Sequence, residues 1–231
     1  MDAFLTPEFW LAVGQIVMID ILLGGDNAVV IALACRNLSP ELRTKGIVWG
    51  TVGAIALRIV LIFFAMSLLK LPFLKLVGAL LLFWIGIKLL VPEDDEHDIQ
   101  ASDRLLGAIK TIIVADFVMS VDNVIGIAGA AQSAGHAGHE MPLVIFGLLV
   151  SIPIIVWGST LVLKLMDRFP MVITAGGMLL GWIAGTLAVT DPAAEPYLPT
   201  SESLHAFAGG LGALLVLLVG KALAARARKE G

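Results

Sequence analysis

Two stretches decide the fold: residues 16–34, IVMIDILLGGDNAVVIALA, and residues 112–130, IIVADFVMSVDNVIGIAGA. A shift of 96 residues superimposes the polar positions of one stretch on those of the other: Asp20 on Asp116, Asp26 on Asp122 and Asn27 on Asn123. The same shift pairs identical apolar residues at Ile16, Ile31, Ala32 and Ala34. Apolar matches are common in hydrophobic segments, but matched acids and amides are not. The two stretches therefore indicate an internal duplication.

A second set of matches extends the duplication. At a shift of 98 residues the matched pairs include Pro72 with Pro170, Gly78 with Gly176, Trp84 with Trp182 and Ile85 with Ile183. We therefore predict one transmembrane domain over residues 1–231. It divides into a first repeat at about 9–91, an acidic cytoplasmic linker at 92–104, a second repeat at about 105–190 and an extra helix at about 204–224.

The composition is that of a membrane protein. Hydrophobic residues make up 58% of the 231 residues and charged residues only 15%, with a mean hydropathy of +0.96. A soluble domain carries roughly a quarter charged residues. Seven apolar runs have about the 20 residues that a helix needs to cross a bilayer: about 9–33, 45–69, 72–91, 105–131, 141–163, 170–190 and 204–224. The sequence predicts an all-α, polytopic membrane protein with seven transmembrane helices.

The distribution of lysine and arginine predicts the orientation. With the N-terminus outside, twelve cations face the cytoplasm and only Lys70 and Lys75 face outward, while Arg58 stays inside a span. The acidic start, Met1–Glu8, is not that of a signal peptide. We predict an N-out, C-in topology. Because three spans per repeat is an odd number, the second repeat enters the membrane inverted, as in many secondary transporters.

The duplicated polar residues lie within predicted spans. An ionised carboxylate at a helix centre costs about 2.5–3.5 kcal/mol on insertion scales, so such groups usually serve a function. Carboxylate and amide oxygens suit hard divalent cations such as Mn²⁺, Mg²⁺ or Ca²⁺. We predict that the transported metal binds to these six residues: Asp20, Asp26, Asn27, Asp116, Asp122 and Asn123.

Two geometries are open for this site. In the favoured one, the Asp-Asn pairs form the inner shell, and a helix break at Gly24-Gly25 turns Asp26-Asn27 towards it. The second half has Met119-Ser120-Val121 in place of the glycines, so a break there is less expected. In the other geometry, Asp26 and Asp122 share the cation, and Asp20 and Asp116 guard the two entrances.

Further polar and sulfur-containing residues are candidates for smaller roles. Arg58, in the second span, is a candidate counter-charge for the aspartates when no cation is bound, or a purely structural ion-pair partner. Accessory ligands could come from Met18, Met119 and Ser120, although core packing is the expected role of both methionines.

Two loops contain clustered ionisable groups. Glu93–Asp98 in the linker is expected to be a solvated segment rather than a metal site, because contiguous like charges repel each other. His136, His139 and Glu140 lie in an outer loop, where a solvated loop is again favoured over a metal site. Cys35 is the single cysteine, so no disulfide forms within the chain.

The Asp-Asn motifs resemble those of the TerC family of integral membrane proteins, particularly its short YjbE/YkoY-like members. The motifs are Asp20-x5-Asp26-Asn27, in Gly-Gly-Asp-Asn-Ala-Val-Val-Ile-Ala, and Asp116-x5-Asp122-Asn123, in Ser-Val-Asp-Asn-Val-Ile-Gly-Ile-Ala. The resemblance covers nearly the whole chain. It implies membership of the LysE-type exporter superfamily and export of Mn²⁺ from the bacterial cytoplasm across the inner membrane. The residues by themselves indicate only a hard divalent cation.

The expected function is alternating-access transport of a divalent cation, with proton antiport through the carboxylates as the coupling hypothesis. No enzyme activity, resident cofactor or nucleic-acid partner is expected, and the oligomeric state stays open. Two alternatives remain. An intramembrane aspartyl protease also uses membrane aspartates, but it needs two rather than four. A non-transporting scaffold for metal loading or secretion is the other.

Overall fold

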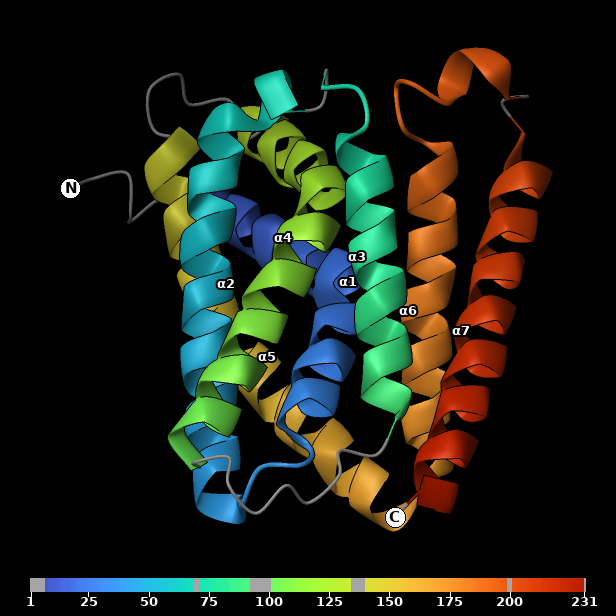
Figure 1. The fold of residues 1–231 in the computed structure, drawn as a ribbon. Coiled ribbons are helices and arrows are strands. Elements are labelled where there is room, and N and C mark those ends of the chain that lie inside the picture. The colour runs from blue at the N-terminus through green and yellow to red at the C-terminus, as the bar shows by residue number, and fades with distance from the viewer. Residues whose placement is uncertain (1–6, 69–70, 92–100, 134–139, 199–200, 231) are drawn as a thin grey trace.

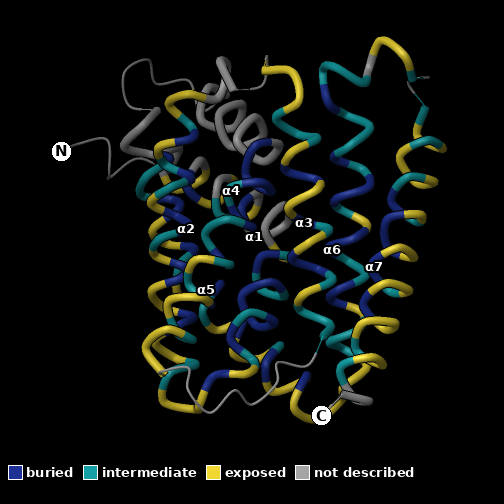
Figure 2. The backbone as a smooth tube through the Cα atoms, in the orientation of Figure 1, coloured by how far each residue is buried: buried dark blue, intermediate teal, exposed yellow. Residues whose placement is uncertain are grey.

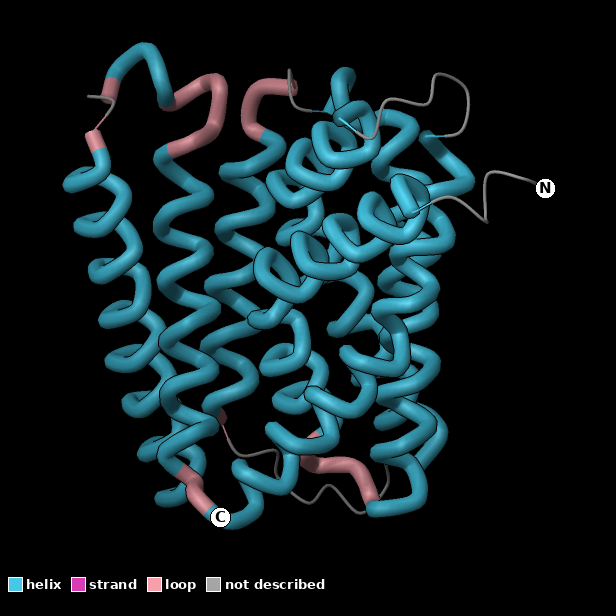
Figure 3. Tube along the Cα trace, turned by 180° about the vertical axis from the view of Figure 1, so that it is seen from behind, coloured by secondary structure: helices cyan, strands magenta, loops and turns pink. Residues whose placement is uncertain are grey.

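The described part of the chain folds into a bundle of long helices (Figure 1). A computed structural model describes residues 7–68, 71–91, 101–133, 140–198 and 201–230. These residues contain no strand, and Figure 3 shows the same all-helical arrangement from behind. The elements are α1 (Pro7–Cys35), α2 (Pro40–Leu68), α3 (Leu74–Leu90), α4 (Ala101–Ser133), α5 (Glu140–Arg168), α6 (Met171–Val189), the 3₁₀ turn η2 (Glu195–Tyr197) and α7 (Glu202–Glu230). The all-α prediction is confirmed for these residues.

Helix boundaries differ from the sequence prediction at the linker. α4 begins at Ala101, so residues 101–104 are helical rather than part of the predicted linker. Asp103 lies in the first turn of α4, where its negative charge is favourable beside the positive end of the helix dipole. Residues 93–98, His136 and His139 lie outside the described residues, and only the backbone of Glu140 is described.

Several helices are long and apolar enough to cross a membrane. Within the described residues, four such segments occur: Pro40–Phe64, Val144–Arg168, Met171–Val189 and Glu202–Ala227. Gly25–Cys35 is a shorter apolar segment of α1. By length and composition these segments are candidate membrane spans, as in a multi-pass membrane protein.

The helices pack as two groups. α1 packs chiefly against α5 and α4, and α2 against α4 and α5; we call these four helices the central group. α3, α6 and α7 pack against one another and form the flanking group, which lies on one side of the bundle in Figure 1. If α1, α2 and α3 are exchanged with α4, α5 and α6, the contact between α1 and α5 becomes the contact between α4 and α2. Both contacts are among the main ones of the bundle. The main contacts therefore follow the pattern of an internal two-fold arrangement.

The outer surface of this bundle is largely apolar, and Figure 2 shows where buried and exposed residues alternate along the helices. Large apolar side chains face outward, with Phe63 66%, Leu80 69% and Trp157 69% exposed. Buried polar groups lie inside: Asp20, Asn27, Thr51, Arg58, Asp116 and Ser120. Outward apolar side chains fit a lipid environment, in which backbone groups are satisfied within each helix.

Small residues allow α6 and α7 to pack very closely. A Cβ added to Gly181 would lie 2.4 Å from the carbonyl oxygen of Gly212, and one added to Gly185 would lie 2.1 Å from that of Ala208. Both distances are far shorter than a non-bonded carbon–oxygen contact. The two backbones touch here because glycine has no side chain, as is common between membrane helices.

A buried acid joins the ends of α3 and α6. Asp191 follows α6, is fully buried and accepts backbone N–H bonds from Phe73, Lys75 and Leu76 at 3.0–3.1 Å. Its carboxylate also accepts the N–H of Ala193 at 2.7 Å. Desolvation raises the pKa of Asp191, but these donors outweigh that effect and hold the pKa below its ordinary value. Asp191 therefore caps α3 from a distant part of the chain.

Candidate functional site

One arginine connects the two halves of the molecule in the interior. Arg58 of α2 is 1% exposed, and its guanidinium forms ion pairs with Asp20 of α1 and Asp116 of α4. Nη1 donates to Asp20 Oδ1 and Nη2 donates to Asp116 Oδ1. Asp20 and Asp116 are the matched positions of the duplication. A single buried cation thus bridges equivalent acids of the two halves.

Ser120 completes this Arg58 bridge. Arg58 Nε donates to Ser120 Oγ at 2.9 Å, and Ser120 Oγ donates to Asp116 Oδ2 at 3.0 Å. Ser120 and Asp116 are four residues apart on α4, so both side chains lie on the same helix face. Ser120 was a candidate accessory ligand for the metal; in this conformation its hydroxyl is used to hold the guanidinium.

Asp26 and Asn27 lie apart from the Arg58 bridge. They follow Asp20 by six and seven residues, which places them about 9–10 Å further along α1. Asn27 is 4% exposed, and neither its Oδ1 nor its Nδ2 has a hydrogen-bond partner in the described structure. The same holds for Asp26 Oδ1 and Asp20 Oδ2. Buried polar atoms without partners are unfavourable by about 1–3 kcal/mol each, so these atoms are available to a ligand.

The predicted break at Gly24-Gly25 does not occur in this conformation. α1 runs without interruption from Pro7 to Cys35. The flanking segments Ile21-Leu22-Leu23 and Ala28-Val29-Val30 are apolar, and Val29 and Val30 pack in the core of the bundle. Glycine in a helix interior costs only about 1 kcal/mol, which such packing easily offsets.

The arrangement differs from both geometries considered from the sequence. One guanidinium contacts both Asp20 and Asp116, so their placement at two opposite entrances is wrong for this conformation. α1 and α4 run in opposite directions through the bundle (Figure 1). The backbones of Asp26-Asn27 and Asp122-Asn123 therefore leave the Arg58 bridge towards opposite ends. That the two pairs close together on a cation stays a prediction, because the side chains of Asp122 and Asn123 are outside the described part.

The two methionine candidates have different positions. Met18 is 62% exposed, so the expected core-packing role is wrong for Met18 in this conformation, and its role as an accessory ligand stays a prediction. Two residues correspond to about 200° of helix rotation, so Met18 faces away from the side on which Asp20 lies. Met119 is buried in the hydrophobic core, as expected for a packing residue.

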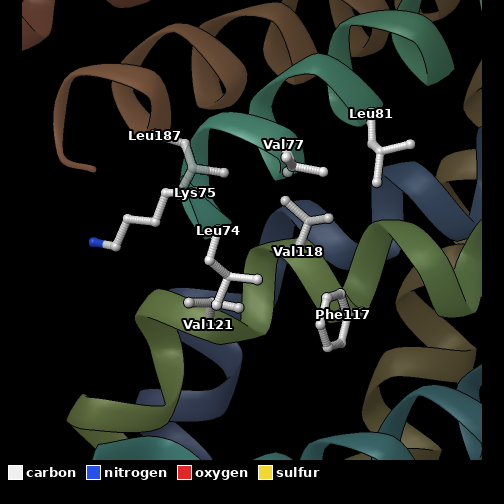
Figure 4. A pocket seen from close by; sticks show the side chains of 9 residues that line it. Leu74, Lys75, Val77, Leu81, Phe117, Val118, Val121 and Leu187 are labelled. Atoms are coloured by element: carbon white, nitrogen blue, oxygen red, sulfur yellow. The ribbon is translucent and has the colours of Figure 1, made fainter. Parts of the chain in front are cut away.

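No finished metal site is visible among the described side chains. Within that set, no three His, Cys, Asp or Glu residues lie close enough together to hold a metal ion. A pocket of about 40 Å³ between α3 and α4 is apolar and does not reach the Arg58 bridge (Figure 4). Its lining consists of Leu74, Lys75, Val77, Gly78, Leu81, Phe117, Val118, Val121 and Leu187. Figure 4 shows the Lys75 ammonium pointing away from these apolar side chains.

Sequence reasoning missed four buried polar residues of the described part; Ser151 and Ser159 bond to their own helix, and the other two are Asp191 and Thr51. Asp191 stands directly after the apolar run of α6, and Thr51 precedes Arg58 by seven residues, which is two turns of the same helix face. Both signals are visible in the sequence. Their importance is evident only from the structure, in which Asp191 is 0% exposed and Thr51 is 1% exposed.

These features define the class of this protein: a multi-pass α-helical membrane protein with a charged cluster enclosed between its helices. The family described as integral membrane protein TerC matches residues 5–229. The chain belongs to the TerC family, as its Asp-Asn motifs predict.

Bacterial membrane proteins of this family are its relatives. YjbE of Bacillus subtilis is 42% identical over 184 residues, covering 80% of this chain and 82% of YjbE. YkoY of Bacillus subtilis is 24% identical over 82% of this chain and 63% of its own length. The inner membrane protein YgdQ of Escherichia coli is 22% identical over 72% of this chain and 75% of its own. No solved structure matches the chain.

Proposed function

We propose that this protein transports a hard divalent cation, with Mn²⁺ as the leading substrate, out of the bacterial cytoplasm across the inner membrane. The observation that supports this most is the bridge of Arg58 to Asp20 and Asp116. A packing role alone would not need two acids at matched positions of a duplication. The buried oxygens of Asp20, Asp26 and Asn27 without hydrogen-bond partners add to the argument.

The proposed membrane topology has seven spans, in which an inverted 3+3 repeat is followed by one C-terminal helix. The opposite directions of α1 and α4, α2 and α5, and α3 and α6 support it (Figure 1). One end of the bundle carries Arg36, Arg43, Lys45 and Arg168, and we call it the basic end. Because positive residues favour the cytoplasmic side, the basic end faces the cytoplasm.

The proposed mechanism exchanges one cation for another. In the empty protein Arg58 neutralises Asp20 and Asp116, which would otherwise repel each other in a low-dielectric interior. A divalent cation binding to the acids takes over this role, and the guanidinium returns when the cation leaves. When the two Asp-Asn pairs close together on the cation, it is held by oxygens of six residues: Asp20, Asp26, Asn27, Asp116, Asp122 and Asn123. Protonation of the carboxylates from outside would then release the cation and couple its export to protons.

Metal flux in proteoliposomes containing only this protein tests the proposal. We expect Mn²⁺ flux in the wild type, competition by Mg²⁺ and Ca²⁺ that ranks the metals, and a loss of about tenfold or more in Asp26→Asn and in Asp122→Asn, because each removes a charged ligand. Asp103→Asn is the matched control, since Asp103 is exposed near the start of α4.

The outcomes separate the alternatives. Unchanged flux in both variants would give the aspartates a structural role. Absence of flux from the wild type would favour the scaffold function. Flux that does not respond to a proton gradient would contradict proton coupling while leaving metal transport intact.

A further inference from the structure

We propose that Thr51 of α2, with Asp26 and Asn27 of α1, forms a separate cation-binding position between the Arg58 bridge and the basic end. This inference rests on the proposed function and adds Thr51 to it: in the present conformation, before the two Asp-Asn pairs close together, Asp26 and Asn27 lie apart from the Arg58 bridge. The position would accept a hard divalent cation before the cation reaches Asp20 and Asp116.

The first support is the state of the Thr51 hydroxyl. Four hydroxyl side chains are buried in the described part of the chain: Thr51, Ser120, Ser151 and Ser159. Ser151 and Ser159 donate to carbonyl oxygens of their own helix at 2.8 Å, and Ser120 bonds to Arg58 and Asp116. Thr51 Oγ1 has no partner there. A buried hydroxyl that omits the usual bond to its own helix is an acceptor left open for a ligand.

The second support is that Thr51 and Asn27 lie at the same depth. Thr51 precedes Arg58 by seven residues, and Asn27 follows Asp20 by seven residues on the antiparallel helix. Seven residues are about 10 Å along a helix and almost two full turns, so each residue lies on the same face as its partner in the bridge. Since Arg58 contacts Asp20, the faces of Thr51 and Asn27 point into the same interior region.

Contacts on both sides of this depth keep α1 and α2 together. Towards the basic end, a Cβ added to Gly46 would lie 2.9 Å from Cys35 Sγ, so the two helices touch there. At the centre, Arg58 joins them through Asp20. Along the same stretch of α2, the neighbouring helix α4 presents aliphatic side chains. Ile112 lies against Gly50, and Ile113 lies against Gly53. No hydrogen-bond partner for Thr51 comes from these two residues.

The chemistry of the three side chains fits a hard cation. Thr51 offers a hydroxyl oxygen, Asn27 an amide oxygen and Asp26 a carboxylate oxygen, and all three are without partners in the described structure. Hard divalent cations prefer oxygen ligands and retain water where the protein supplies few. A position with a single carboxylate binds more weakly than the cluster around Asp20 and Asp116. A weak first position suits transport, because the cation must move on.

The test compares Thr51→Val with the wild type, using the full chain in detergent and in proteoliposomes. Valine keeps the shape of threonine and removes the hydroxyl. Without metal, we expect Thr51→Val to unfold at no lower a temperature than the wild type, because no hydrogen bond is lost. The Mn²⁺ concentrations for half-maximal thermal stabilisation and half-maximal flux should both rise about three- to tenfold, as for loss of one polar contact.

Two further variants serve as controls. Thr160→Val makes the same change on α5, where the hydroxyl is exposed and bonded to the Val156 carbonyl, and should behave as the wild type. Thr51→Ser restores a hydroxyl and should restore the Mn²⁺ response. An unchanged Mn²⁺ dependence in Thr51→Val overturns this inference, whether or not its unfolding temperature falls. Absence of any response to Mn²⁺, Mg²⁺ or Ca²⁺ in the wild type overturns the proposed function, and this inference with it.

Discussion

At the scale of single residues, Arg58 determines how the buried charges of the interior are paired. Its side chain is 1% exposed, and all three guanidinium nitrogens have partners, supplied by Asp20, Ser120 and Asp116. Removing two opposite charges from water costs several kcal/mol per ion, which close pairing and hydrogen bonds must offset. An ion bridge of this kind contributes little net stability when complete, but it is very sensitive to loss of one member.

We predict that Arg58→Met destabilises the protein strongly in the absence of metal. Two buried carboxylates would lose their counter-charge, and breaking a buried ion pair from one side costs about 3–5 kcal/mol. Mn²⁺ should raise the unfolding temperature of the variant more than that of the wild type, because the cation replaces the guanidinium. Thermal unfolding in detergent with EDTA or with Mn²⁺ measures both effects.

Asp167→Asn is the control for this experiment. It breaks the ion pair between Arg43 and Asp167, whose side chains are 26% and 54% exposed. Surface pairs contribute about 0–1 kcal/mol, so this variant should stay close to the wild type and gain nothing extra from Mn²⁺. A stable Arg58→Met protein with an ordinary Mn²⁺ response would show that the guanidinium does not stand in for a cation.

At the scale of elements, α3 depends on another part of the chain for its start. Phe73, at its N-cap position, has a positive φ of 68° and forms no side-chain cap bond. The Asp191 carboxylate instead accepts the backbone N–H groups of Phe73, Lys75 and Leu76 at the start of the helix. A negative charge at this end also interacts favourably with the helix dipole. The loop after α6 therefore fixes the angle at which α3 enters the bundle.

We predict that Asp191→Ala lowers the free energy of unfolding by about 1–2 kcal/mol at neutral pH, as for loss of a helix cap. Because the pKa of Asp191 is held below its ordinary value, its contribution is complete above the unfolded pKa of about 3.9 and is lost as pH falls through the lower folded pKa. The difference in free energy of unfolding between wild type and variant should therefore disappear only below about pH 4. Unfolding curves of both proteins from pH 7 to pH 3 measure it. A gap that closes near neutral pH would exclude Asp191 as the titrating cap.

At the scale of the whole molecule, the central and flanking groups are held together differently. α6 and α7 touch through glycines, and α3 packs against both. Between the groups the contacts are fewer; α3 meets α4 where Gly78 lies against Val118, and α6 meets α1 where Gly176 lies against Val29 and Leu33. The polar residues of the proposed site all belong to the central group. Alternating access would then move the central group against the flanking group.

We predict that a disulfide between the two groups blocks Mn²⁺ flux. A Cβ at position 78 would lie 2.7 Å from a γ-carbon of Val118, which is within reach of a disulfide. In a Cys35→Ala background, oxidised G78C/V118C should lose flux and recover it on reduction. Oxidised G86C/V216C links α3 to α7 inside the flanking group and should keep its flux, since a Cβ at position 86 lies 3.3 Å from Val216 Cγ1. Full flux through oxidised G78C/V118C would contradict movement between the groups.

Local sequence patterns determined much of this protein. The apolar runs set the helices because a chain in lipid must satisfy its backbone within each segment, and the all-α fold and the family followed from those runs and the Asp-Asn motifs. Because burying ionisable groups is costly, a functional or structural role was expected for Asp20, Asp26, Asp116 and Arg58. Even the inward face of Arg58 was implied, since a charge inside a span avoids lipid.

Only the tertiary structure decided which of these groups meet. Arg58 pairs with acids 38 and 58 residues away, and Asp191 caps a helix that begins more than 110 residues before it. The Gly24-Gly25 pair suggested a break, yet packing kept α1 continuous. Helix periodicity acts over a few residues, whereas partners depend on how whole helices cross and pack. The burial of Thr51, two turns before Arg58 on the same helix face, became visible for the same reason.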